Sequence, residues 1–320
     1  MLNVYEHEVR FYREIAGSLA MRVPRCYFGV IEAQSFSGLR RALLALIKAA
    51  PARLTPLLAM SLVLLLSVRA RRFVLLLEDF DGTTQGDQLA GCTTEQAAGP
   101  LRALASLHAT FWETSGVAHF NWLPVAGRWD KLTLSGFRRG RAAFLHTYGQ
   151  LLAPESSEVL VWLEDHGDDL LDYFLEFPIT VIHGDYRLDN LFWADSSTPG
   201  SVAVIDWQGI HCGPGVTDLA YFLASSLSPE VSDQDEARLV CLYHEELRQN
   251  GVEGYPLEQC HHNYEAAKLV LVYRLVSGID FVDLGEGRGK ALRECFVARL
   301  FARLPQPPYE RFLSAAGGIA

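Results

Sequence analysis

The sequence predicts an α+β fold, and three observations support this class. Two apolar runs in the N-terminal part, 23–30 and 73–77, have the β-branched and aromatic content typical of strands. A strand–turn–strand pattern follows at 179–206. Beyond Pro154, the remaining chain has mainly helical apolar spacing. Strands and helices therefore concentrate in different parts of the chain, which is the α+β pattern.

The chain opens with a segment that predicts a helix. One helical stripe carries the apolar residues Tyr5, Val9, Tyr12 and Leu19. Glu8 lies on the same stripe, where a carboxylate needs a cationic partner or a route to water. Two interpretations of Glu8 stay open: a side chain that reaches water at the edge of the stripe, or a carboxylate with a dedicated partner.

The expected strand 73–77 ends in a polar, turn-rich link. Thr93 and Gln96 then form a capping box, in which each side chain satisfies a backbone N–H of the other residue. This pattern predicts the start of a helix. Its inward face carries Leu101, Leu104, Leu107 and Phe111.

The composition narrows the class of partner and the compartment. A formal net charge of -10 over 320 residues disfavours nucleic acid, because a phosphate backbone needs a basic face. Six cysteines without a C-x-x-C pair disfavour a zinc ribbon or a disulfide scaffold and fit a reducing compartment. The opening residues lack the apolar core of a signal peptide. The sequence therefore predicts a cytoplasmic protein and leaves its oligomeric state open.

Residues 34–72 form an atypical basic and apolar insertion. They carry seven basic residues and no acid, so the rest of the chain has a charge of -17. The apolar run 54–68 would span only ~22 Å as a helix, short of the ~30 Å hydrocarbon core of a bilayer. Membrane association is therefore disfavoured, although an amphipathic surface anchor or a membrane-associated partner protein stays open. We expect an inserted hairpin or foreign sequence outside the working core.

The strand-rich part of the chain carries the residues with chemical function. The apolar run 179–182 predicts a buried strand that leads into a loop with His183 and Asp185. Two further strands, 190–193 and 202–205, are separated by a run of turn residues. These two strands are expected to form a hairpin.

The expected hairpin places two oxygen-bearing side chains together. If Thr198 is the midpoint of the turn, Asn190 and Asp206 lie opposite each other, with Cα atoms roughly 4.5–5.5 Å apart. Carboxylate and amide oxygens are ligands for a hard cation such as Mg²⁺. Asp185 lies on the loop that leads to the same place. The sequence therefore predicts a magnesium site with a second carboxylate beside it.

This combination suits phosphoryl transfer. A cation neutralises charge on nucleotide phosphates, and the remaining aspartate orients an attacking hydroxyl. The spacing from His183 to Asn190 is the H-x-D-x-x-x-x-N pattern of kinases, followed by a metal-binding aspartate at 206. Other candidates are weaker: Cys260-His261-His262 has no second cluster for a zinc site, and the glycines at 285–289 follow no clear strand.

The motifs resemble those of a known superfamily. They read H-G-D-Y-R-L-D-N-L-F-W at 183–193, V-I-D-W-Q at 204–208 and G-P-G-V-T-D-L-A-Y-F-L at 213–223. They are similar to the aminoglycoside phosphotransferase and choline kinase superfamily, nearest to ecdysteroid-kinase-like proteins and to the kinase domains fused to some acyl-CoA dehydrogenases. The similarity extends to Y-E-H-E-V-R-F-Y-R-E at 5–14, F-V-L-L-L-E-D-F at 73–80 and G-D-Q-L-A-G-C at 86–92.

The resemblance implies a protein-kinase-like fold with two lobes. Residues 1–86 would be a partial N-terminal lobe that contains the insertion 34–72, and 87–320 a mainly helical catalytic lobe. The implied activity is phosphorylation of a hydroxyl on a small molecule, with ATP and Mg²⁺ as cofactors.

The resemblance also implies roles for individual residues. Asp185 would be the catalytic aspartate, and Asn190 and Asp206 would bind Mg²⁺. His183 and Asp218 would brace the catalytic loop.

The implied nucleotide contacts come from the N-terminal part. Glu8 would match the glutamate of the N-terminal lobe helix, and Glu78 and Asp79 would match the hinge beside the adenine.

Two departures from the family pattern favour an alternative function. One is that residues 34–72 replace what resembles a short hairpin connection between two strands of the N-terminal lobe. The other lies at the start of the chain. In the family, a phosphate-covering hairpin and a lysine-bearing strand precede the helix that carries Glu8. Here the first lysine is Lys48, inside the insertion, so we expect a truncated N-terminal lobe. The alternative is a degenerate pseudokinase that binds nucleotide or serves as a scaffold.

Overall fold

The computed structural model describes residues 4–32, 72–113, 120–127, 136–154, 156–193, 202–279 and 287–313. The helices are α1 (Val4–Glu14), α4 (Thr94–Thr110), α7 (Phe137–Tyr148), α8 (Ser156–Phe174), α9 (Val216–Ser226), α10 (Asp233–Gln249), α11 (Leu257–Ser277) and α12 (Arg288–Ala302). The strands are β1 (Cys26–Ile31), β2 (Phe73–Leu77), β3 (Thr84–Gln85), β4 (Ile179–Ile182), β5 (Leu191–Trp193), β6 (Val202–Val204) and β7 (His211–Pro214). Short 3-10 helices are η1 (Ala16–Ser18), η2 (Gly149–Leu151), η3 (Leu188–Asn190), η4 (Trp207–Gly209) and η5 (Tyr309–Phe312). The α+β class is confirmed.

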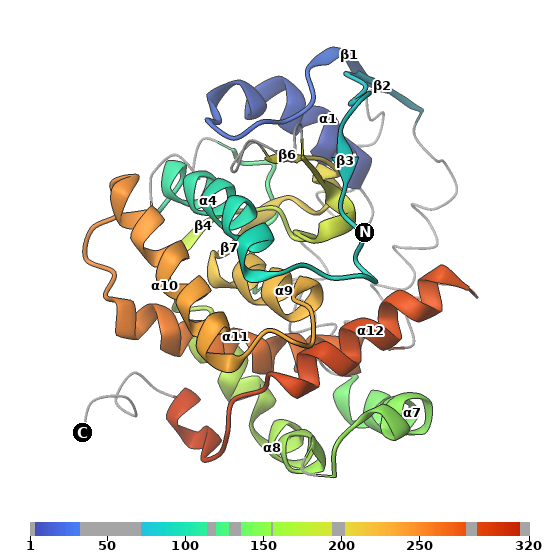
Figure 1. Cartoon of the computed structure of the whole chain (residues 1–320), viewed down its shortest axis with the longest axis vertical. Coiled ribbons are helices and arrows are strands. Elements are labelled where there is room, and N and C mark those ends of the chain that lie inside the picture. The colour runs from blue at the N-terminus through green and yellow to red at the C-terminus, as the bar shows by residue number, and fades with distance from the viewer. Residues whose placement is uncertain are drawn as a thin grey trace, which may run out of the picture.

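The N-terminal sheet consists of β1 and β2, which pair antiparallel at the top of Figure 1. The prediction for 73–77 is confirmed at both ends of β2. The other predicted strand, 23–30, is shifted in the structure to 26–31. Pro24 has no N–H to donate to a ladder, so pairing begins beyond it. The register places Ile31 opposite Phe73.

The predicted N-terminal helix is α1, which packs on η4. The ring of Phe11 stacks on that of Trp207, with centroids 3.8 Å apart and an interplanar angle of 9°. Both side chains are fully buried. Tyr5, by contrast, is 47% exposed and stacks on Phe73 of β2. Helix α1 therefore joins the N-terminal sheet to the segment that follows β6.

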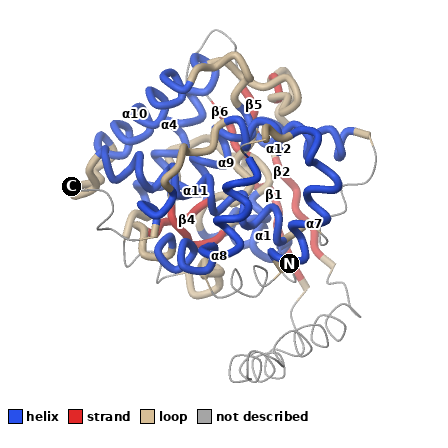
Figure 2. The backbone as a smooth tube through the Cα atoms, turned by 90° about the horizontal axis from the view of Figure 1, so that it is seen from below, coloured by secondary structure: helices blue, strands red, loops and turns tan. Residues whose placement is uncertain are grey.

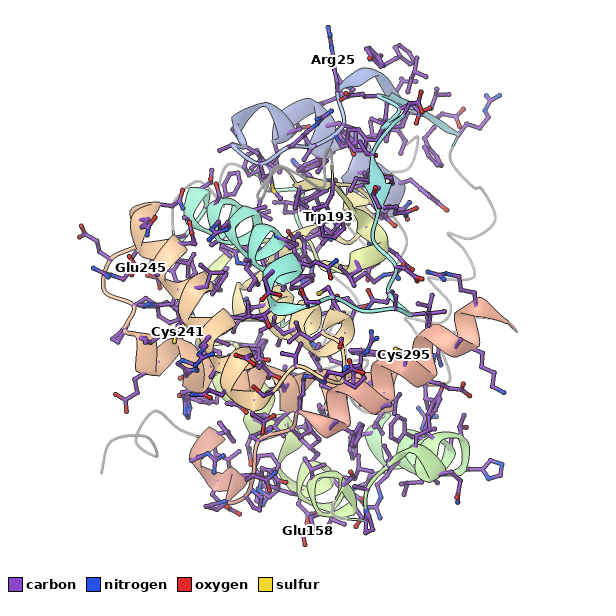
Figure 3. All side chains as sticks on the ribbon, viewed as in Figure 1. Arg25, Glu158, Trp193, Cys241, Glu245 and Cys295 are labelled. Carbon is purple, nitrogen blue, oxygen red and sulfur yellow. The ribbon has the colours of Figure 1, made fainter. Side chains whose placement is uncertain are left out.

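The described ranges contain two more small sheets, one near the N-terminal sheet and one among the C-terminal helices (Figures 1 and 2). One has the order β3-β5-β6, and the other pairs β4 with β7. Trp193 of β5, labelled in Figure 3, lies in the middle of the molecule between these two parts. These sheets hold the loop and hairpin that the sequence singled out.

Helices form most of the C-terminal part (Figure 1). The capping box is confirmed: Thr93 is the N-cap of α4, and both reciprocal contacts with Gln96 are present. Helix α4 runs beside α10 in Figures 1 and 2. Helix α9 is almost completely buried in the centre of this part. None of the helices in the described ranges is long and apolar enough to cross a bilayer.

Candidate active site

The predicted catalytic loop follows β4, whose Val181 and Ile182 are fully buried. Gly184 lies in this loop with a φ of +83°, a region that side chains with a Cβ rarely adopt. A Cβ here would also overlap the carbonyl oxygen of Gly209. Glycine at 184 therefore allows the loop to approach the segment after β6.

His183 connects β4 to the end of β6. Its Nε2 lies 2.9 Å from the carbonyl oxygen of Ile205, and because a carbonyl only accepts, Nε2 carries the proton. Its Nδ1 accepts the N–H of Asp185 at 3.2 Å. The ring packs edge-on against Trp207, with centroids 4.7 Å apart. These contacts fit a bracing role for His183.

Asp218, at the start of α9, holds the same loop from the other side. Its carboxylate accepts the backbone N–H of His183 at 2.6 Å and of Gly184 at 2.9 Å. Burial alone would raise the pKa of this carboxyl, but the contact with His108 and the Gly184 N–H hold it below its usual value of 3.8. His108 is itself held by the hydroxyl of Tyr243 at 2.7 Å. Asp218 is therefore an ionised carboxylate in the core.

Asp185 projects from the loop with both carboxylate oxygens in contact with donors. Oδ1 accepts the hydroxyl of Tyr221 at 2.9 Å. Oδ2 accepts Nδ2 of Asn190 at 3.0 Å and Nε of Arg187 at 3.2 Å. The side chain is 35% exposed, so it remains accessible from solution.

The predicted pairing of Asn190 with Asp206 is wrong by one residue. Leu191 pairs with Val204, and the N–H of Ile205 donates to the carbonyl of Asn190 at 3.0 Å. Asn190 is therefore opposite Ile205, because the register does not centre on residue 198. Asp206 is the next residue, in the left-handed conformation with φ 63° and ψ 66°. This turn reorients its side chain relative to the strand.

The donor set still fits a hard cation. Nδ2 of Asn190 is bound to both the carbonyl and the carboxylate of Asp185, so its amide oxygen is the atom available to a metal. Asp206 supplies a carboxylate from the neighbouring strand end. Two protein ligands suit Mg²⁺, which usually keeps waters and takes oxygens from substrate phosphates. In the described ranges, no three His, Cys, Asp or Glu side chains form a metal cluster.

Glu8 lies beside this hairpin end, because Phe11, one turn further along α1, stacks on Trp207. Burial and then the charge of Asp206 raise the pKa of Glu8, while the N–H of Trp207 and the side chain of Gln208 lower it. Glu8 is only 8% exposed. Glu8 is therefore largely shielded from water, and its hydrogen-bond partners in the described ranges are neutral groups rather than a cation. Two carboxylates this close are a favourable environment for a cation.

Glu78 and Asp79 follow β2 and differ in their surroundings. Glu78 accepts the N–H of Arg25 and pairs with Arg22, each at 3.0 Å. The Arg25 N–H is the main cause that lowers the pKa of Glu78. Asp79 is exposed. The structure thus gives Glu78 a role in joining β2 to the segment before β1, and a hinge role for both residues stays a prediction.

A cavity of about 370 Å³ opens beside Asp185. Arg187 and Tyr221 line it near Asp185. Its apolar wall comes from α11, α12 and the segment between them: Leu275, Ile279, Leu292 and Phe296. The sequence reasoning missed Arg187 and Tyr221, although both lie inside the motifs quoted above.

One comparison with known proteins shows the family of this chain. The sequence model of the phosphotransferase enzyme family matches residues 3–250, about three quarters of the chain. The chain therefore belongs to the phosphotransferase enzyme family. Its α+β structure with a helical C-terminal part is the protein-kinase-like fold that the motifs predicted. The curated proteins gave no match.

Solved structures give distant similarities. A microcompartment-associated aminopropanol kinase is 17% identical with a TM-score of 0.49; the match covers 99% of this chain and 83% of that one. A macrolide 2'-phosphotransferase from Brachybacterium faecium is 16% identical with a TM-score of 0.43, covering 93% and 79%. A choline/ethanolamine kinase family protein from Mesorhizobium loti is 11% identical with a TM-score of 0.40, covering 98% of each chain.

Proposed function

We propose that the protein transfers a phosphoryl group from ATP, with Mg²⁺, to a hydroxyl of a small molecule. One observation carries this proposal: the carboxylate of Asp185 lies at a cavity of about 370 Å³ and contacts the amide of Asn190, a candidate metal ligand. The hydroxyl-orienting group and the metal-binding group therefore adjoin each other. This is the arrangement that an in-line transfer requires.

Each residue of the site has a distinct task in this proposal. Asp185 accepts a hydrogen bond from the acceptor hydroxyl and orients its oxygen toward the phosphoryl group. Asn190 and Asp206 hold Mg²⁺, which neutralises phosphate charge when bound. His183 and Asp218 keep the loop in place. Glu8, Glu78 and Asp79 serve the nucleotide side of the site.

The cavity is where the acceptor would bind. With an acceptor bound, its apolar wall from α11 and α12 would limit the water beside the acceptor oxygen, where water competes as the phosphoryl acceptor. The guanidinium of Arg187 lies between Asp185 and Asp189, at 3.2 Å and 2.9 Å. Arg187 therefore balances charge beside the attacking group.

One observation favours the pseudokinase alternative. The polar contacts that Glu8 makes in the described ranges come from Trp207 and Gln208 rather than from a lysine. A lysine at this place would align the nucleotide phosphates. The alternative predicts no turnover, with nucleotide binding in the nucleotide-binding form and none in the scaffold.

Two measurements separate these functions. Titration calorimetry with ATP, with and without Mg²⁺, is expected to show binding that requires Mg²⁺ and is lost in Asp206→Ala. ADP formation is then followed with a panel of small alcohols, including amino alcohols, sugars and hydroxy acids. Mg²⁺-dependent binding with alcohol-dependent ADP formation supports the phosphotransferase. Binding without turnover indicates the nucleotide-binding pseudokinase, and absence of binding rejects the phosphotransferase and leaves the scaffold.

A further inference from the structure

Tyr221 differs from the other partners of Asp185 in where it comes from. Arg187 and Asn190 both lie in the same loop as Asp185, and both donate to Oδ2. Tyr221 is 36 residues away, on α9, and donates to Oδ1 at 2.9 Å. In the described ranges, its hydroxyl is the side-chain donor that fixes Oδ1 from outside the loop.

The surroundings of Tyr221 keep its hydroxyl in place. The ring packs edge-on against Phe296 of α12, with centroids 5.3 Å apart. Asp218, one turn earlier on α9, holds the backbone of the catalytic loop. Burial and then the charge of Asp185 raise the pKa of the Tyr221 phenol. The phenol therefore stays protonated and acts as a donor to the carboxylate.

Tyr221 also lines the cavity in which the acceptor would bind. A carboxylate oxygen has two lone pairs, and the Tyr221 hydroxyl occupies one of those on Oδ1. The other lone pair is left for the proton of an acceptor hydroxyl. Rotation of the carboxylate about its Cβ–Cγ bond would move this lone pair away from the acceptor.

We propose that Tyr221 is the positioning residue of the transfer reaction, because its hydroxyl fixes the Asp185 carboxylate with Oδ1 directed at the acceptor. This inference rests on the proposed function. If a hydrogen bond to a charged group stabilises the transition state, its loss lowers the rate roughly 10- to 100-fold. Tyr221 does not contact Asn190 or Asp206 in the described structure, so nucleotide affinity is unaffected.

The test is Tyr221→Phe, which keeps the ring and its contact with Phe296. We expect kcat for ADP formation, measured with an alcohol that gives turnover, to fall 10- to 100-fold. The Kd for Mg·ATP should stay within about twofold. The matched control is Tyr173→Phe, which removes a hydroxyl whose contact is with His262. Arg274 lines the cavity, and His262 lies about 18 Å away from it along α11. The control should therefore leave kcat unchanged.

A double-mutant cycle with Asp185→Asn separates positioning from a structural role. If Tyr221 positions Asp185, Tyr221→Phe lowers kcat in the parent 10- to 100-fold. In the Asp185→Asn background, the same change lowers kcat by less than about twofold. An equal loss in both backgrounds, or no loss in the parent, overturns the role of Tyr221 while the proposed function stands. A parent without turnover rejects the proposed function, and the role of Tyr221 with it.

Discussion

At the scale of single residues, Asp218 shows how a buried charge supports the site. It is 1% exposed, yet it accepts two backbone N–H groups from the loop that carries Asp185. The sequence motif predicted a bracing carboxylate at this position. It gave no signal for His108, which contacts Asp218 from α4 across 110 residues. Partners this distant in sequence depend on the packing of whole helices.

Asp218 makes the stability of the fold depend on pH. The pKa of Asp218 is lower in the folded protein than its usual 3.8. Its contribution to the free energy of unfolding is therefore complete above pH 3.8 and is lost as the pH falls below that value. We expect Asp218→Asn to lower the free energy of unfolding by about 2–3 kcal/mol at pH 7, since hydrogen bonds to a charged acceptor are lost.

Urea denaturation of parent and variant from pH 8 to pH 3 measures this contribution. The difference in the free energy of unfolding between parent and variant should be constant down to about pH 5 and should become smaller below pH 3.8. A difference that is the same at every pH would contradict an ionised Asp218.

At the scale of elements, features that depend on a few neighbouring residues were predicted correctly, and the register of the β5–β6 hairpin was not. The capping box at Thr93 is a contact within four residues, so the sequence contains it completely. The hairpin of β5 and β6 depends on its turn, whose geometry a count of residues does not determine, and the predicted register was one residue off. Tyr221 was missed for a different reason: its hydroxyl contacts a loop 36 residues earlier, and no pattern within α9 indicates that contact.

The ends of β1 and β2 permit a test of the insertion. The prediction for 34–72 falls almost wholly outside the described residues, which resume at Arg72. The N–H of Glu32 donates to the carbonyl of Arg72 at 3.0 Å, so these two residues are neighbours across the hairpin. A two-residue turn such as Asn-Gly fits between such neighbours.

Replacing 33–71 with Asn-Gly should therefore keep the fold. We expect the melting temperature to stay the same or rise, because removing a sequence as apolar as 54–68 removes a stretch that can favour association. Differential scanning calorimetry measures this. A fall of more than ~5 °C, on the order of 1–2 kcal/mol, would show that the replaced segment contributes to the core.

At the scale of the whole molecule, a buried ionic cluster ties the C-terminal helices together. Glu236 of α10 lies 3.2 Å from Nζ of Lys268 on α11 and 2.9 Å from Nε of Arg303, just after α12. The hydroxyl of Tyr264 donates to Glu236 at 2.6 Å. The lysine is visible in the sequence as a charge inside an apolar helical run, but its partners come from other helices and only the fold shows them.

Removing the carboxylate leaves buried cations with fewer partners. We expect Glu236→Gln to lower the free energy of unfolding by about 3 kcal/mol, the lower end for breaking a buried pair, since Glu265 still pairs with Lys268 at 3.0 Å. The control on the same helix is Glu245→Gln, whose exposed pair with Arg248 contributes less than about 1 kcal/mol. Equal losses for the two variants in urea denaturation would contradict a stabilising cluster.

The fold class, the family and the candidate site residues Asp185 and Asn190 were predictable from motifs, because they depend on short stretches such as 183–193. The cavity beside Asp185 was not predictable, because α11 and α12 form its apolar wall with side chains that are typical of any helical core. Asp185 belongs both to the loop that the motifs predicted and to the lining of this cavity. Its proposed task is to orient an acceptor hydroxyl beside a metal-bound nucleotide.

The most direct test of this claim compares the parent with Asp185→Asn in one measurement of ADP formation at saturating Mg·ATP and acceptor. Asparagine keeps the shape of the side chain but removes the charge that attracts the acceptor proton. Turnover should fall by ~10²–10⁴, while the Kd for Mg·ATP stays within a few-fold, because Asn190 and Asp206 are unchanged. Equal turnover in the two proteins would contradict the role of Asp185 and, with it, this account of the site.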